Sequence, residues 1–161
     1  MLMLRIGVTG HMNLTPNAAR LVFDALRSHL VEIADEVTGV SCIARGADSL
    51  FAEAVLETGG ALEVVLPSRD YRDTKVNPDH AEQFDRLLSK ATRVRTMDFS
   101  RASREAYVAA NEAMLGSVDE LVAVWDGQPA VDRGGTASVV ANARQRGVRV
   151  TVIWPEGAAR E

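Results

Sequence analysis

The sequence predicts an α/β fold of three layers, in which a mostly parallel, roughly six-stranded sheet carries helices on both faces. Two observations lead to this expectation. Short apolar runs rich in β-branched residues alternate with longer segments whose apolar residues recur at helical spacing, which is the pattern of βαβ units. Several of the short runs are almost continuously apolar, as strands are when helices cover both faces of a sheet.

The expected strands, in chain order, are 4–8, 40–44, 62–66, 93–97, 120–125 and 148–154, of which the fourth is the weakest. Five helices are expected between them. Thr15 can cap the first helix, with Pro16 at its first position and apolar residues at helical spacing from 22 to 33. The others are expected to start near 47, at 77–78, near 101 and after 135, and 67–78 is the longest stretch without a pattern.

Composition favours one compact domain over residues 1–156, followed by a tail at 157–161. The chain has 161 residues, of which 47% are hydrophobic and 25% charged, as in ordinary globular proteins. Its formal net charge is -4. Because an acidic domain repels a polyanionic backbone, we expect nucleic acid to be an unlikely partner.

The single cysteine, Cys42, is expected in the second strand as a core residue and has no partner for an internal disulfide. The three histidines share no metal-ligand spacing with it, so no metal site is expected. No apolar run approaches the roughly 20 residues of a membrane-spanning helix. The start of the sequence lacks the features of a signal peptide. We therefore expect a cytoplasmic protein without a membrane partner.

Candidate binding residues follow the first, second and fifth expected strands, because ligands of open parallel sheets bind beyond the carboxyl ends of the strands. A glycine-containing turn before a helix can bind phosphate through its backbone N–H groups, although an ordinary capping turn explains it equally well. The first loop lacks the glycine fingerprint of dinucleotide sites, so no NAD and no other cofactor is expected. The candidates in these three loops are Thr9, Gly10, His11, Arg45, Gly46, Asp48, Asp126, Gly127, Arg133, Gly134, Gly135 and Thr136.

Individual side chains allow both a functional and a structural interpretation. Arg45 precedes a helix N-terminus, where a positive charge is unfavourable without an anion, so it is expected to pair with phosphate. Asp48 can simply complement the helix dipole. Asn111, on the fourth helix, can bind a base or ribose or remain exposed. Asp126 and Asp132 are the catalytic candidates, since a carboxylate beside a phosphate site can serve cleavage of a glycosidic bond.

Two segments carry a resemblance to known families. Residues 41–48, with the sequence S-C-I-A-R-G-A-D, are similar to the S-G-x-A-R-G-x-D segment of the DNA-processing protein A family, with Cys42 in place of the glycine. The second half resembles small bacterial SLOG proteins of the YpsA type, through Tyr107, Asn111, Asp119, 122–127 and 134–137. The chain thus resembles the Rossmann-like superfamily that also contains the Lonely Guy phosphoribohydrolases.

This resemblance implies a nucleotide-like small-molecule ligand, with its phosphate on residues 134–136 and on the 9–11 loop, and a possible homodimer. Val139 stands where Lonely Guy enzymes carry a glutamate that serves catalysis, which puts their mechanism in doubt here. We therefore expect a nucleotide-binding sensor or carrier. The alternative is a nucleoside monophosphate N-glycosidase, like the phosphoribohydrolases or the deoxyribosyltransferases, that uses Asp126 or Asp132. A DNA-binding domain is the third interpretation.

Overall fold

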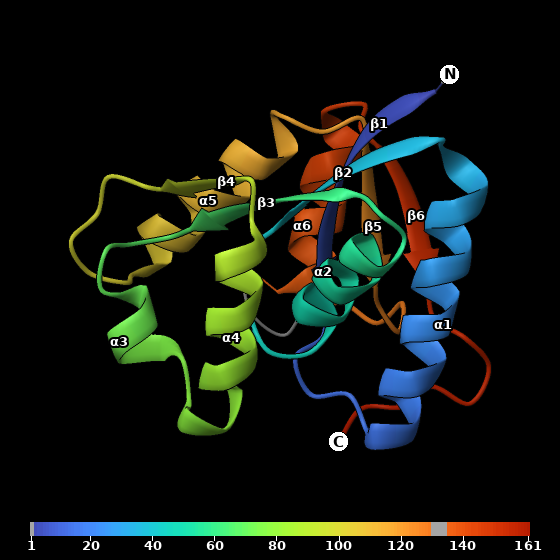
Figure 1. Cartoon of the computed structure of the whole chain (residues 1–161), viewed down its shortest axis with the longest axis horizontal. Coiled ribbons are helices and arrows are strands. Elements are labelled where there is room, and N and C mark those ends of the chain that lie inside the picture. The colour runs from blue at the N-terminus through green and yellow to red at the C-terminus, as the bar shows by residue number, and fades with distance from the viewer. Residues whose placement is uncertain (1, 130–134) are drawn as a thin grey trace.

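The computed structural model describes residues 2–129 and 135–161 (Figure 1). Its strands form one sheet in the order β4-β3-β2-β1-β5-β6, and every neighbouring pair is parallel. The predicted α/β fold, with six parallel strands, is therefore confirmed. The strands are β1 (Met3–Gly10), β2 (Glu36–Ser41), β3 (Ala61–Leu66), β4 (Arg93–Thr96), β5 (Glu120–Val124) and β6 (Arg149–Ile153).

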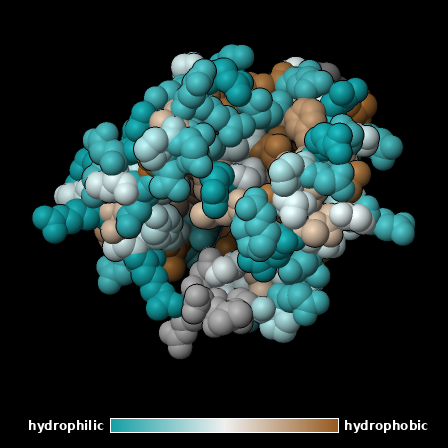
Figure 2. All heavy atoms as spheres, turned by 90° about the horizontal axis from the view of Figure 1, so that it is seen from below, coloured by the Kyte–Doolittle hydropathy of each residue, from teal (hydrophilic) through white to brown (hydrophobic). Residues whose placement is uncertain are grey.

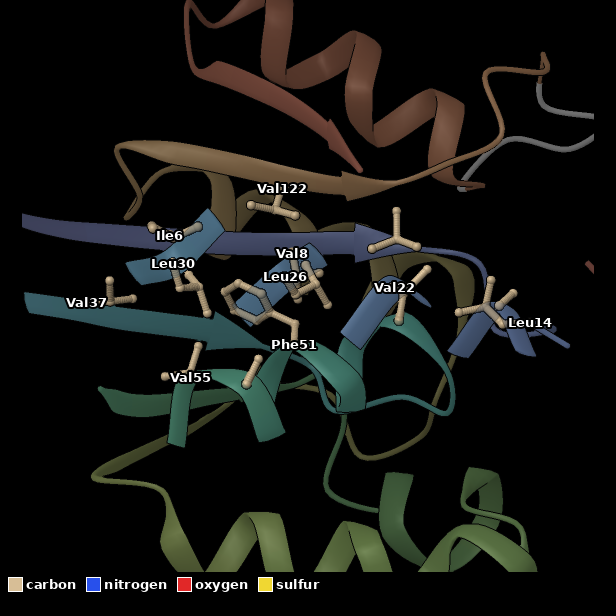
Figure 3. Packing of buried hydrophobic residues seen from close by; sticks show 14 residues of the cluster. Ile6, Val8, Leu14, Val22, Leu26, Leu30, Val37, Phe51, Val55 and Val122 are labelled. Carbon is tan, nitrogen blue, oxygen red and sulfur yellow. The ribbon is translucent and has the colours of Figure 1, made fainter. Parts of the chain in front are cut away.

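Helices cover both faces of this sheet, as three layers require. On one face, α1 and α2 pack on β1, β2 and β5 through an apolar cluster that includes Ile6, Leu26 and Phe51 (Figure 3). On the other face, α5 and α6 pack on the sheet around Met114 and Leu121. The helices are α1 (Pro16–Ile33), α2 (Ala47–Glu57), α3 (Tyr71–Lys75), α4 (Pro78–Lys90), α5 (Arg104–Leu115) and α6 (Thr136–Gln145).

The start of α1 follows the predicted capping chemistry. The hydroxyl of Thr15 accepts a hydrogen bond from the backbone N–H of Ala18 at 3.1 Å, and Pro16 occupies the first turn.

The second strand differs from its prediction, because β2 ends at Ser41 rather than at 44. Its register is set by pairing with β1, from Met3 opposite Glu36 onwards. The prediction that Cys42 lies in a strand is therefore wrong: it is half-buried in the following loop.

The strand order reverses at β1, which has β2 on one side and β5 on the other. Such a switch in strand order leaves a crevice at the carboxyl edge of the sheet. Residues 159–161 return to this edge, where the N–H of Glu161 donates to the carbonyl of Asn13 and the N–H of Thr15 donates to that of Ala159. In the part of the chain that the structure describes, no helix is long and apolar enough to cross a membrane.

Candidate functional site

A cavity of about 760 Å³ opens at the carboxyl edge of the sheet. Figure 2 looks onto this face, which is hollowed near its middle between hydrophilic side chains. The cavity is lined by many of the predicted binding residues, namely Thr9, Gly10, His11, Arg45, Asp48, Asn111, Gly135 and Thr136. Gly46, Asp126 and Gly127 do not line it. The predictions for Asp132, Arg133 and Gly134 fall outside the described residues.

Two glycines let the end of β1 and the start of α2 meet. A Cβ at Gly10 would lie 2.5 Å from that of Ala47 and 2.7 Å from that of Val124, so only glycine fits between α2 and β5. Gly46 has a φ of +84°, and a Cβ there would lie 2.7 Å from the carbonyl oxygen of His11. That carbonyl accepts a hydrogen bond from the backbone N–H of Ala47 at 3.1 Å. Gly46 thus helps to shape the cavity wall without contributing to its lining.

His11 and Asp126 form a polar cluster beside the cavity. The backbone N–H of Asp126 donates to Nε2 of buried His11 at 3.1 Å, and one carboxylate oxygen lies 3.3 Å from the same nitrogen. Burial and the nearby Arg160 guanidinium lower the pKa of His11. A hydrogen bond from the N–H of Gln128, together with His11 and Arg160, lowers the pKa of Asp126. This carboxylate is therefore held by the protein, and a catalytic role for Asp126 would require it to leave these partners.

The loop after β2 is held in a strained conformation. Ile43 is a buried, β-branched residue with a φ of +46°, which side chains of its kind rarely adopt. Its N–H donates to the hydroxyl of Ser41, and its carbonyl oxygen lies 3.0 Å from Nε2 of His80 and 3.3 Å from the hydroxyl of Ser49. These contacts turn the chain so that Cys42 and Arg45 reach the cavity.

His80 is a site residue that sequence reasoning missed, since a histidine on a predicted helix suggests an exposed position. It is 5% exposed and lines the cavity. A signal was available, because His80 lies in the first turn of α4, the longer of the two helices between β3 and β4. In a parallel sheet that turn lies at the carboxyl edge, where ligands bind.

Asp48 is a carboxylate on the cavity wall, in the first turn of α2. Burial raises its pKa to about 7, against the opposing effect of a hydrogen bond from the backbone N–H of Ala44. Burial, helped by the charge of Asp48, also raises the pKa of the Cys42 thiol. The cysteine is therefore a neutral thiol at physiological pH rather than a nucleophile.

Within the described ranges, three cations reach the same cavity: Arg45, Lys75 and Arg160. Arg160 lies 3.6 Å from Asp126. Arg45 and Lys75 form no ion pair with a described carboxylate. Asp48 is the one acidic residue among the described residues of the lining. The cavity wall thus favours an anion, although the chain as a whole is acidic.

The N-terminus of α6 opens onto this cavity. Gly135 is its N-cap and supplies no side chain, the first turn holds no acidic residue, and Thr136 and Ala137 line the cavity. Unpaired backbone N–H groups and the helix dipole together attract an anion at such a place. Val139, one turn on, is 6% exposed and packs in the core between α5 and α6.

Aromatic rings border the cavity as well. Trp125 lines it, and its indole N–H donates to the carbonyl of Gln128 at 2.9 Å, which fixes the ring. Tyr107, which is 40% exposed, lies edge-on to the ring of Tyr71. Flat apolar faces of this kind can pack against a heterocycle. Among the described residues, no three histidine, cysteine, aspartate or glutamate side chains come together as a metal site would require.

A parallel sheet whose strand order switches at β1, with helices on both faces, defines a Rossmann-like fold, and its polar cavity lies at the switch point. No protein-family model and no curated protein matches the sequence. Solved structures do match in fold. DNA processing protein A from Streptococcus pneumoniae aligns with a TM-score of 0.70 and 16% identity, over 96% of this chain and 52% of the other, so this chain spans about half of that protein.

Two further structures extend the comparison. DNA processing protein A from Helicobacter pylori, described by its single-stranded DNA binding mode, aligns with a TM-score of 0.69 and 16% identity over 99% of this chain and 69% of the other. The molybdenum cofactor binding protein from Rippkaea orientalis aligns with a TM-score of 0.60 and 18% identity, over 94% of this chain and 77% of the other. The predicted resemblance to the Rossmann-like superfamily is thereby confirmed at the level of the fold.

These structures correct one expectation. The prediction that nucleic acid is an unlikely partner is wrong, since a fold neighbour at a TM-score of 0.69 binds single-stranded DNA. The prediction rested on the net charge, which sums over the whole surface. A binding site depends on its local charge, and here Arg45 and Lys75, which have no ion pair with a described carboxylate, lie at the cavity of an acidic chain.

Proposed function

We propose that this protein binds a nucleotide-like small molecule in the cavity at the carboxyl edge of the sheet, as a sensor or carrier. One observation carries the proposal: the N-terminus of α6, which no described side chain caps, and Arg45, which has no ion pair among the described residues, line the same cavity. Both favour a phosphate group. Trp125 and Tyr107 offer faces for a heterocycle on the same wall. The molybdenum cofactor binding protein of similar fold supports a small-molecule ligand.

The test is the dependence of binding on phosphate. Purified protein is titrated with GMP and AMP and with the matching nucleosides, guanosine and adenosine, while the midpoint of thermal unfolding is recorded. A nucleotide whose free concentration is 100 times its Kd stabilises the fold by about 2.7 kcal/mol. We expect a nucleotide to raise the midpoint and its nucleoside to leave it nearly unchanged. Equal shifts with both would rule out the phosphate site.

Single-stranded DNA is the second candidate ligand, because two of the similar structures are DNA processing protein A. The motif shared with that family, at residues 41–48, contributes Cys42, Arg45 and Asp48 to the cavity wall. Fluorescence anisotropy with a labelled oligonucleotide tests this candidate at physiological salt. Displacement of the oligonucleotide by a mononucleotide would place both at one site, whereas retention in its presence would indicate a separate DNA surface.

A further inference from the structure

Asp48 is the exception on a cavity wall that otherwise favours anions. Its carboxylate faces the cavity together with Arg45 and Lys75, yet it forms no ion pair with any described residue. A phosphate beside it would be repelled. A ligand that fits this cavity must therefore bring its phosphate to one part of the wall and a different group to Asp48.

The position of Asp48 is fixed by the protein rather than left to solvent. Its backbone carbonyl accepts a hydrogen bond from the hydroxyl of Ser41 at 3.0 Å, and the neighbouring Ser49 donates to the carbonyl of Ala44 at 2.7 Å. The N–H of Ala44 uses one acceptor site of the carboxylate. Once it ionises, above its pKa of about 7, the carboxylate offers about four such sites on two oxygens, so acceptors remain for a ligand.

The fold sets the span between this carboxylate and the phosphate site. Asp48 follows β2, the first turn of α6 follows β5, and β1 lies between the two strands. Two strand spacings correspond to roughly 10 Å. A nucleotide carries its heterocycle and its phosphate at opposite ends, and its length is of this order. The base would then reach Asp48 while the phosphate lies on the N-terminus of α6.

We propose that Asp48 selects the heterocycle, by accepting two hydrogen bonds from the ring N–H and the exocyclic amino group of a 2-amino-4-oxopyrimidine ring, as found in guanine nucleotides and pterins. This inference rests on the proposed function. Two adjacent donors match the two oxygens of a carboxylate. Adenine and cytosine place a ring nitrogen acceptor beside their amino donor, so one oxygen of the carboxylate would face a lone pair.

A competing role is purely structural, since an acidic residue in the first turn stabilises a helix. The substitution Asp48→Asn separates the two roles. The amide keeps the size of the side chain but replaces one acceptor by a donor. It should therefore favour xanthine, which presents a carbonyl where guanine has its amino group. Asp79, an exposed acidic residue in the first turn of α4, supplies the matched control Asp79→Asn.

Binding of GMP, XMP and AMP to the wild type and both variants, measured by isothermal titration calorimetry, tests the proposal. The wild type and Asp79→Asn should prefer GMP to XMP by roughly tenfold or more, and Asp48→Asn should reverse the order. A structural role would instead weaken all three nucleotides together or lower only the unfolding midpoint. A pterin without phosphate is titrated in parallel. If it binds the wild type more tightly than GMP does, the ring that Asp48 selects belongs to a pterin rather than to a guanine nucleotide.

Two failures are distinguishable. If no nucleotide and no pterin binds the wild type, the proposed function falls and this inference with it. If GMP and AMP bind with equal affinity, and Asp48→Asn changes neither, the cavity still binds nucleotides but Asp48 does not select the base.

Discussion

The two ends of the sheet each hold a histidine and a carboxylate in contact, but only one end carries a cavity lined by binding candidates. At the amino end, Nε2 of His29 lies 3.0 Å from buried Glu120, which also accepts a hydrogen bond from Thr151. At the carboxyl end, His11 contacts Asp126 at 3.3 Å. The two pairs resemble each other in chemistry, so the residue types alone do not reveal function.

The surroundings separate the two pairs. Burial acts to raise the pKa of Glu120, but hydrogen bonds from His29 and Thr151 outweigh it and lower the pKa. Oε1 of Glu120 accepts both of these hydrogen bonds, which join α1 and β6 to β5, while its buried Oε2 has no partner among the described residues. Around His11, by contrast, Arg45 and Asp48 line the cavity without ion-pair partners among the described residues. The unmatched polar groups at the carboxyl edge differ from the unmatched oxygen of Glu120 in that they line a cavity, which supports the binding site proposed at this end.

The largest expected loss of stability comes from a substitution at the carboxyl end of the sheet. Gly10→Ala places a Cβ 2.5 Å from that of Ala47 and 2.8 Å from the carbonyl oxygen of Val124, neither of which can rotate away. We expect a loss of about 3 kcal/mol in the free energy of unfolding, measured by urea denaturation. Gly7→Ala is the control in the same strand, because its nearest contact is the flexible sulfur of Met114 at 3.0 Å. Equal losses in both variants would contradict the tight fit at Gly10.

A second variant removes the histidine–carboxylate pair at the amino end of the sheet and leaves the carboxyl end unchanged. Glu120→Ala removes the acceptor of both His29 and Thr151 and leaves a void at the start of β5. Removing one partner of a buried pair costs about 3 kcal/mol, and the partial exposure of His29 places this loss at the low end of the range. Urea denaturation measures the loss. Nucleotide affinity of the folded variant should stay within about twofold of the wild type, a difference of roughly 0.4 kcal/mol, and a larger drop would link this end to the site.

A third variant separates stability from binding at one residue. Gly135 has an extended backbone at the N-cap of α6, so Gly135→Asp supplies a cap and should leave stability unchanged or raise it by about 0.5 kcal/mol. The same negative charge should weaken nucleotide binding by about tenfold, or 1.4 kcal/mol. Gly135→Asn caps without the charge and should bind more tightly than Gly135→Asp. Identical affinities of the two variants in calorimetry would exclude an anion at this helix end.

The last expected effect is the pH dependence of stability. Because the pKa of Asp48 is raised to about 7 in the fold, the folded protein holds more protons than the unfolded chain between about pH 4 and 7. Asp48 should therefore lower the stability of the ligand-free protein as pH rises through this window, by at most about 4 kcal/mol over the three pKa units. His11, with its lowered pKa, acts in the opposite direction below about pH 6.5.

Comparison with Asp48→Asn isolates the contribution of Asp48, since His11 is common to both proteins. The difference in stability between the two, from urea denaturation at pH 5 and pH 8, should grow in favour of the variant as pH rises. A constant difference would show that Asp48 titrates normally.

The sequence alone predicts the layers of the fold but not the details of the site. Alternating strand and helix patterns are local, and so is the cap at Thr15, which forms as expected. The end of β2 depends on pairing with β1 and, at Ser41, with Val64 of β3, a long-range register that no local pattern encodes, and Cys42 was misplaced for that reason. His80 was missed because its burial comes from contacts with the distant Ile43 and Ser49. Arg160 reaches the cavity only because residues 159–161 pair with 13–15, and such contacts leave no periodic signal.

If the cavity beside α6 and Arg45 binds the phosphate of its ligand, loss of the Arg45 guanidinium must weaken binding, and titration of GMP into the wild type and Arg45→Ala measures this. Arg20→Ala, on exposed α1 surface, is the control. We expect one GMP per chain, bound with wild-type affinity by Arg20→Ala and about tenfold more weakly by Arg45→Ala, a difference of roughly 1.4 kcal/mol. Equal affinity in all three proteins, or no binding to the wild type, would contradict it.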